Sequence, residues 1–274
     1  MRNFARGHDR WLSTLLRWRA SSPLNRSVAG LQPSSIAAPA SAPALEWPGK
    51  ETRSEAQGND ERLEVLVPRL PHVGRALFDC DGAHHPCRLP ICAVCALVYR
   101  EGAIPHLHAL ANTYVGPHQV VTIYLRLLAP GSLADADPPR IREMFRKRLD
   151  RAGFKGAIVM GGIEVAWQEK WQRWLVHAHV LAIGVDEVTW DQLEAALKDS
   201  GTARPVVTQP LRDPDEQLSY CIKFVDYHRP GRKRVPLKAD RLVELAAWCS
   251  RYRFEDFLFV YGVPRPGGRI VVDE

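Results

Sequence analysis

The 274-residue sequence lacks several features that would define its class at once. No hydrophobic run approaches the roughly 18 residues of a membrane-spanning helix, so we expect no transmembrane segment. No long apolar stretch follows the charges near the N-terminus, and no secretory signal is therefore evident. A P-loop of the form GxxxxGK[ST] is also missing, which argues against a helicase motor within this chain.

The composition suits a protein with one sizeable hydrophobic core, and the net charge suits an anionic partner. Hydrophobic residues make up 46% of the chain, and the net charge is +6. Residues 1–60 differ in character: residues 21–48 are dense in Ser, Ala and Pro, and residues 2–26 carry six arginines against Asp9 alone. We expect a disordered basic extension here. Such an acid-poor start also resembles an organelle transit peptide, and a basic DNA-binding arm is the other interpretation.

Residues 174–183 are apolar apart from two histidines. Side chains on a strand alternate between faces, so His177 and His179 would point the same way. Two neutral imidazoles on one face suit a divalent transition metal. The alternative is a pair of histidines satisfied by hydrogen bonds near a sheet edge.

A carboxylate is expected beside this pair. The preceding segment, residues 157–167, has the pattern of a strand that forms a hairpin with the histidine strand. If the turn is centred between Lys170 and Trp171, Glu164 lies directly opposite His177 and shares its face. Glu164 would then complete a mixed oxygen and nitrogen site; otherwise it is a solvated charge on the strand.

Downstream, residues 217–224 have the pattern of a helix start. Tyr220 and Lys223 would lie one turn apart and meet. A neighbouring ammonium favours the phenolate form of a tyrosine, which makes it a better nucleophile. The alternative is a tyrosine ring packed in the core and a solvated lysine.

Four of the six cysteines fall within a short segment, in the spacing C-x6-C-x4-C-x2-C. Four thiolates at such spacing suit tetrahedral Zn²⁺ in a structural site. Free buried thiols and disulfides remain as alternatives, the latter without other signs of an oxidising compartment. The residues are Cys80, Cys87, Cys92 and Cys95, with His84 and His85 between the first two.

The remaining periodicity predicts an α+β fold, in which a mainly antiparallel sheet carries the metal site and helices pack around it. We expect Thr189 to be the N-cap of one helix and Gly201 its C-terminal stop. Helices are predicted over 99–111, 139–152, 188–200 and 240–252, and further strands over 120–128, 206–208 and 257–261.

The order of a carboxylate strand, an HxH strand and a YxxK segment resembles the HUH endonuclease superfamily, and within it the rolling-circle replication initiators of bacterial plasmids. The resemblance covers residues 80–227, including the cysteine-rich segment. It implies a ferredoxin-like or RRM-like sheet with the HxH on a central strand. Ala178 between the histidines is smaller than usual, and Phe224 stands where many relatives have tyrosine.

The resemblance also implies an activity. Tyr220 would attack a phosphodiester of single-stranded origin DNA, forming a 5′-phosphotyrosine link and a free 3′ hydroxyl. Mg²⁺ or Mn²⁺ held by His177, His179 and Glu164 would polarise the phosphate, and Lys223 would stabilise charge. A host helicase would be a partner, and the protein would be DNA-associated in the bacterial cytoplasm. A transposase or relaxase with the same chemistry, or a non-catalytic zinc protein that binds nucleic acid, are the alternatives.

Basic residues follow the tyrosine segment directly and suit contacts with a DNA backbone, with a solvated loop as the alternative. They include Arg229, Arg232, Lys233 and Arg234. We divide the chain into an N-terminal extension (1–60), a cysteine-rich zinc segment (61–112), a catalytic domain (113–230) and a C-terminal part that completes it (231–274). Tyr227 is a candidate second nucleophile.

Overall fold

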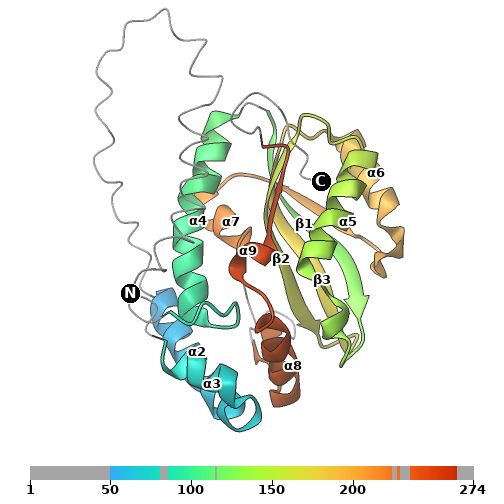
Figure 1. The fold of residues 1–274 in the computed structure, drawn as a ribbon. Coiled ribbons are helices and arrows are strands. Elements are labelled where there is room, and N and C mark those ends of the chain that lie inside the picture. The colour runs from blue at the N-terminus through green and yellow to red at the C-terminus, as the bar shows by residue number, and fades with distance from the viewer. Residues whose placement is uncertain (1–49, 81–85, 115, 224–226, 229–234, 264–274) are drawn as a thin grey trace, which may run out of the picture. The chain divides into compact units, whose positions relative to one another are not determined.

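The structure of the protein is a computed structural model (Figure 1). It describes residues 50–80, 86–114, 116–223, 227–228 and 235–263. Residues Lys50–Tyr261 belong to one structural unit. In chain order its helices and strands are α2 (Lys50–Arg69), α3 (Pro71–Phe78), α4 (Ala93–Thr113), β1 (His118–Leu128), η2 (Leu133–Asp135), α5 (Pro138–Arg151), β2 (Ile158–Gln168), β3 (Arg173–Ile183), α6 (Glu187–Ala196), η3 (Lys198–Ser200), β4 (Val206–Pro210), α7 (Pro214–Tyr220), β5 (Tyr227–His228), β6 (Val235–Pro236), α8 (Ala239–Cys249), α9 (Phe254–Phe257) and β7 (Leu258–Tyr261).

Five strands form one antiparallel sheet in the order β4-β1-β3-β2-β7. The elements β1, α5, β2, β3, α6 and β4 follow one another as in a ferredoxin-like β-α-β-β-α-β unit. The later strand β7 extends this sheet at the β2 edge. The predicted α+β class with a mainly antiparallel sheet is therefore confirmed, and the strand that carries His177 and His179 is the central one.

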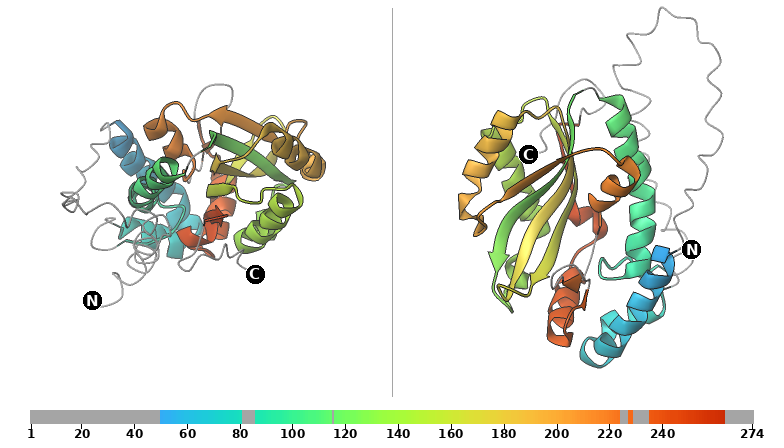
Figure 2. Two further views of the ribbon diagram at one scale, coloured as in Figure 1. Left: turned by 90° about the horizontal axis from the view of Figure 1, so that it is seen from above. Right: turned by 180° about the vertical axis from the view of Figure 1, so that it is seen from behind.

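One face of the sheet packs against α5 and α6 (Figure 2). Alternate residues of β3 and β2 are fully buried on this face, as the two-residue period of a strand requires. From α5, the ring of Phe145 lies 4.5 Å from that of Phe259 in β7, measured between centroids. The strand residues include Val176, Ala178, Val180, Ile163 and Val165.

The other face of the sheet lies toward α4 and α7 (Figure 2). The end of α7 comes against the backbone of β2, because the carbonyl oxygen of Cys221 lies 3.1 Å from where a Cβ would stand on Gly162. In α4, the apolar side chains of Ile104 and Leu107 are buried. Both faces of the sheet are thus covered, and His177 and His179 lie on the face toward α7. Among the described helices, none is both long and apolar enough to span a membrane.

Some expectations about helices need correction. Helix α2 begins at Lys50, so residues 50–60 are helical rather than part of an irregular extension; residues 1–49 lie outside the described part. Helix α7 ends at Tyr220 instead of beginning near it. A proline suits a first helical turn, since its fixed φ matches the helix and its missing N–H is not needed there, and α7 accordingly starts at Pro214.

The N-cap of α6 is Asp186, and the assignment of Thr189 to that role is wrong. The carboxylate of Asp186 accepts a hydrogen bond of 2.7 Å from the backbone N–H of Thr189. A cap residue bonds the N–H three positions ahead, which makes Thr189 the third residue of the first turn. The prediction that Gly201 ends this helix is also wrong: α6 ends at Ala196 with Leu197 as its C-cap, and Gly201, with φ of +80°, caps the short 3-10 helix η3 instead.

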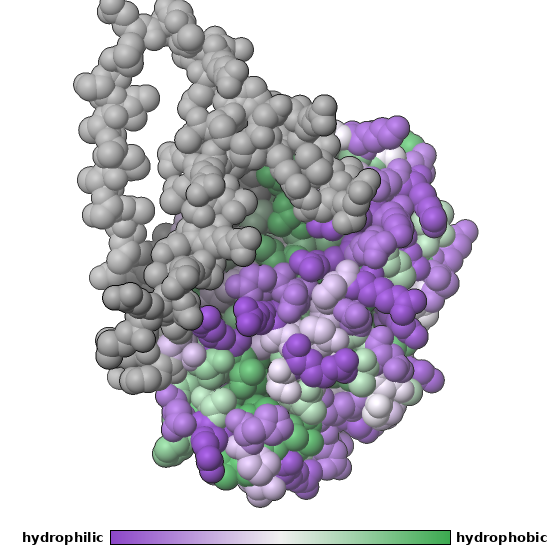
Figure 3. Space-filling view, in the orientation of Figure 1, coloured by the Kyte–Doolittle hydropathy of each residue, from purple (hydrophilic) through white to green (hydrophobic). Residues whose placement is uncertain are grey.

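Helix α5 is basic, but much of its charge is engaged within the fold. Arg142 donates hydrogen bonds to the carbonyl oxygens of Glu255 and Leu258, and Arg148 forms an ion pair of 3.2 Å with Asp199. Figure 3 shows mostly hydrophilic residues over the side of the molecule where α5 and α6 lie. This helix therefore has the character of a solvated face that also secures α9 and β7, on the opposite side of the sheet from the histidines.

We expect Phe145→Ala to lower the free energy of unfolding by about 3–5 kcal/mol, because it removes a fully buried ring between α5 and the sheet. Urea denaturation measures the change. Lys147→Ala on the exposed face of the same helix should change it by less than about 0.5 kcal/mol. Similar losses in the two variants would contradict the packing described.

Candidate functional site

Strands β2 and β3 form a hairpin in which Glu164 pairs with His177. The last pair before the turn joins Gln168 to Arg173. The register predicted from the sequence is therefore confirmed. Because the period is two, His179 lies on the same face, and the three side chains meet there.

The three side chains bring their ligand atoms together in the way a metal site requires. The Nε2 atoms of His177 and His179 are 3.1 Å apart. The Oε2 atom of Glu164 lies 3.7 Å from the first and 3.9 Å from the second. One carboxylate oxygen and two imidazole nitrogens within 4.8 Å of one another form a candidate metal-binding group. This donor set suits Mn²⁺ and neighbouring divalent metals.

Hydrogen bonds on the far side of each ring orient the histidines. The Nδ1 of His177 is 3.3 Å from the carbonyl oxygen of Leu175, so it donates there and leaves Nε2 with a free lone pair. The Nδ1 of His179 is 2.9 Å from the hydroxyl oxygen of Thr122 on β1. A hydroxyl can donate or accept, so Thr122 can serve either tautomer of His179. In the tautomer that binds metal through Nε2, Thr122 accepts.

Burial shapes the electrostatics of this group. It lowers the pKa of His177 to about 4, so this ring is neutral near neutral pH and available as a ligand. Burial also raises the pKa of Glu164 well above its usual value. The charge of Lys223, a hydrogen bond from the backbone of Lys223 and the charge of Arg100 oppose that rise.

The other carboxylate oxygen of Glu164, Oε1, is buried without a hydrogen-bond partner among the described residues. A buried unpaired oxygen is costly, and a cation at the two Nε2 atoms would give this carboxylate a charged partner. The residues present therefore fit a divalent metal ion.

The tyrosine segment reaches the same face. Tyr220 is the last residue of α7, and the Nζ of Lys223 lies 5.0 Å from the centre of its ring. Lys223 is only 8% exposed, so the interpretation of this lysine as a solvated charge is wrong. Tyr220 is partly buried. The predicted contact between the two residues is present, although Lys223 lies beyond the end of the helix.

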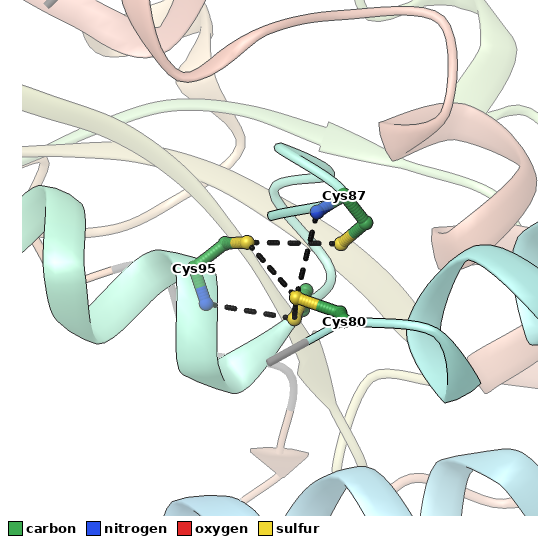
Figure 4. A group of neighbouring side chains, drawn as sticks. Cys80, Cys87 and Cys95 are labelled. Carbon is green, nitrogen blue, oxygen red and sulfur yellow. Dashed lines mark hydrogen bonds between the residues drawn. The ribbon is translucent and has the colours of Figure 1, made fainter. Parts of the chain in front are cut away.

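The four cysteines form a second candidate metal-binding group (Figure 4). Cys80 follows α3 and Cys95 belongs to the first turn of α4, and their sulfur atoms are 3.4 Å apart. The sulfur of Cys95 is 3.7 Å from that of Cys87, and the same distance separates Cys92 from Cys80. These separations exceed the S–S bond length of about 2.05 Å, and all four cysteines are free.

Donors surround the sulfur atoms, which stabilises thiolate charge. The backbone N–H groups of Cys87, Arg88 and Cys95 each point at a cysteine sulfur, at 3.4 to 3.5 Å. Arg88 takes φ of +59°, which is uncommon for a residue with a side chain. The neighbouring thiols, Cys87 before Cys95, hold the pKa of Cys92 well below its usual value, and the pKa of Cys87 rises in turn.

A side chain from outside the cysteine segment joins this group. The Nδ2 of Asn59 in α2 donates to the sulfur of Cys92 at 3.4 Å. Its Oδ1 accepts from the backbone N–H of Ala93 at 3.0 Å, satisfying a free donor at the start of α4. Sequence reasoning missed Asn59, Thr122 and Arg100, because each acts across a long sequence separation. Residues 84–85, 229 and 232–234 lie outside the described residues.

No family model, curated protein or solved structure matches the chain.

We expect Thr122→Val to lower the affinity of the Glu164, His177 and His179 group for Mn²⁺ by about 10- to 100-fold, because it removes the acceptor that orients His179. Electron paramagnetic resonance of Mn²⁺ titrations measures this. Thr208→Val is the matched control, since Thr208 is exposed on the adjacent strand β4. Equal affinities in the two variants would show that Thr122 does not orient the ring.

Proposed function

We propose that this protein nicks single-stranded DNA by metal-dependent transesterification, with Tyr220 as the nucleophile. The observation that carries the proposal is the convergence of two elements on one sheet face. Glu164, His177 and His179 gather on β2 and β3, and the turn that follows Tyr220 lies against β2 at Gly162, two residues before Glu164. A metal group, a phenol and an ammonium are the three parts that such a reaction needs.

His177, His179 and Glu164 would hold the ion, and Mn²⁺ or Mg²⁺ are the candidates. When bound, the ion supplies Lewis-acid polarisation of a phosphate oxygen. Imidazole nitrogens favour Mn²⁺ over Mg²⁺, which prefers oxygen ligands and bound water. The neutral state of His177 and the hydrogen bond that the Nδ1–H of His179 donates to Thr122 keep the two Nε2 atoms available as ligands.

Tyr220 and Lys223 would carry the covalent step. The phenolic oxygen forms a bond to phosphorus while the bond from phosphorus to the 3′ oxygen breaks. The phenol loses its proton to solvent, and the leaving 3′ oxygen gains one. The ammonium of Lys223, which lies 5.0 Å from the centre of the tyrosine ring, would stabilise the negative charge that builds on the phosphate. One phosphodiester bond replaces another, so the phosphotyrosine link keeps the free energy of the broken bond and the DNA strand can be rejoined by the reverse reaction.

The biological role follows from the resemblance described above, and rolling-circle initiation is the role that we favour. The freed 3′ hydroxyl would prime synthesis, origin DNA would be the substrate, and a host helicase would unwind the duplex. Arg229, Arg232, Lys233 and Arg234 are candidates for backbone contacts. A transposase or relaxase would use the same chemistry on another DNA.

For the cysteine group we propose a structural Zn²⁺ ion. Four sulfur ligands leave no open position for a substrate, which is typical of structural rather than catalytic zinc. The hydrogen bonds from surrounding N–H groups and from Asn59 support thiolate ligands. Such an ion would fasten the end of α3 to the start of α4.

We expect Tyr220→Phe to abolish a covalent protein–DNA adduct that the wild type forms with a single-stranded origin oligonucleotide and Mn²⁺. The change removes the attacking oxygen and keeps the ring. Denaturing electrophoresis of 5′- and 3′-labelled DNA measures the adduct and its polarity.

Tyr227→Phe is the control for the choice of tyrosine, and it should retain adduct formation. His177→Ala should lose the adduct through loss of the metal. Binding of DNA without cleavage by the wild type would favour the zinc-dependent nucleic-acid-binding protein instead.

We expect Asn59→Ala to weaken Zn²⁺ binding by about 10- to 100-fold, because a donor to the Cys92 sulfur is lost. Competition with a chromophoric chelator measures the affinity, and Co²⁺ substitution reports the ligand set. Asn112→Ala, an exposed position in α4, is the control. Unchanged zinc affinity in Asn59→Ala would make that hydrogen bond irrelevant to the site.

A further inference from the structure

Gly162 occupies an unusual place in the middle of β2. Glycine weakens a strand, because it is entropically costly and offers no side chain to pack. Yet Gly162 lies two residues before Glu164 on the same face, and it pairs with His179 across the hairpin. A glycine within a strand often marks the close approach of another backbone.

The approaching backbone belongs to the residues just after Tyr220. A Cβ on Gly162 would stand 3.1 Å from the carbonyl oxygen of Cys221 and 3.6 Å from the Cα of Ile222. The first distance is tighter than nine in ten real Cβ contacts, so a side chain at Gly162 would force this turn to shift by a few tenths of an ångström. The turn thus rests directly on the β2 backbone.

Two further contacts hold the turn against the sheet. Cys221 and Ile222 are fully buried. Lys223, the next residue, is also buried, and its charge acts on Glu164. The segment is therefore anchored on both sides of its contact with Gly162, and it has little room to relax. A displacement there is passed to Tyr220, the residue directly before Cys221.

We infer that Gly162 is a positioning residue, which sets the height of the Tyr220 segment above the metal-binding group by having no side chain. The inference rests on the proposed function of Tyr220 as nucleophile. In-line attack requires the reacting atoms in close and aligned contact, and misplacement by about 1 Å can cost about 100-fold in rate. The missing Cβ at Gly162 thus allows the Tyr220 segment to lie as close to the metal-binding group as in-line attack requires.

The test is Gly162→Ala in the full-length chain. We expect the single-turnover rate of adduct formation on single-stranded DNA to fall by up to about 10-fold, because the turn is displaced by a few tenths of an ångström. Mn²⁺ affinity, measured by electron paramagnetic resonance, should stay at the wild-type value, since Glu164, His177 and His179 keep their register. Binding of the same oligonucleotide, measured by fluorescence anisotropy, should also be unchanged.

A matched pair of variants separates positioning from loss of stability, and it remains informative if Gly162→Ala does not fold. Ile222→Val loosens the turn from its buried side, and it should slow adduct formation without changing Mn²⁺ affinity. Ile163→Val makes the same chemical change at a fully buried position next to Gly162, but facing α5 and α6. It should leave the adduct rate unchanged.

The outcomes distinguish this inference from the proposed function. A wild type that forms no adduct overturns the function. A wild type that forms the adduct, with Gly162→Ala equally fast, leaves the function standing and overturns the inference. A parallel fall of Mn²⁺ affinity and adduct rate in Gly162→Ala also overturns it, because the glycine would then support the metal-binding strands. Equal effects of Ile222→Val and Ile163→Val count against it in the same way.

Discussion

The register of the β2–β3 hairpin is the constraint on which the site depends. A slip of one residue would turn every side chain of β3 to the opposite face. His177 and His179 would then enter the layer beneath α5 and α6, where Val176, Ala178 and Val180 are now fully buried. The apolar residues that fill that layer fix the register, and the register delivers the histidines to Glu164. The site is thus held in place by packing on the face that it does not occupy.

Burial then gives these three residues their chemical character. Desolvation disfavours the charged forms of both the carboxyl and the imidazole, which is the cause of the pKa shifts of Glu164 and His177. A divalent cation between them would reverse the effect on the carboxylate, since it supplies the charge that burial removed. The same burial leaves the Glu164 Oε1 without a hydrogen bond among the described residues. Burial of these polar groups without partners costs free energy in the metal-free protein, and a bound metal ion would supply the missing partner.

The sequence predicts the parts of this arrangement that follow from local periodicity. Alternation places both histidines on one face, and the position of the turn places Glu164 opposite His177; both were confirmed. The spacing of the cysteines likewise indicates that they gather, which they do. These features depend on residues within one hairpin or one short segment, where the geometry of a strand or loop leaves few choices.

Contacts between distant segments could not be predicted in this way. Thr122 meets His179 because β1 pairs with β3, and nothing near either residue specifies that pairing. Asn59 lies in a segment whose composition indicated an extension. Gly162 shows no local reason to be glycine until the turn after α7 is seen against it. The end of α7 at Tyr220 was missed for a related reason, because the turn that replaces the next helical residues is stabilised by β2 rather than by its own sequence.

Helix α4 links the two candidate metal groups physically. Its first residue, Ala93, is bonded to Asn59 and Cys95 lies in its first turn, so the cysteine group determines where the helix begins. Arg100 follows Ala93 by about two turns, a rise of about 10 Å. Its buried charge acts on Glu164 against the effect of burial. Tyr99 stacks on Phe254 at 4.8 Å between ring centres, which holds α4 beside α9. The hydrogen bond at the first residue of α4 and the stacking of Tyr99 thus both help to position Arg100. The electrostatic environment of the carboxylate on the sheet is therefore set partly by how four sulfur atoms hold the start of a helix.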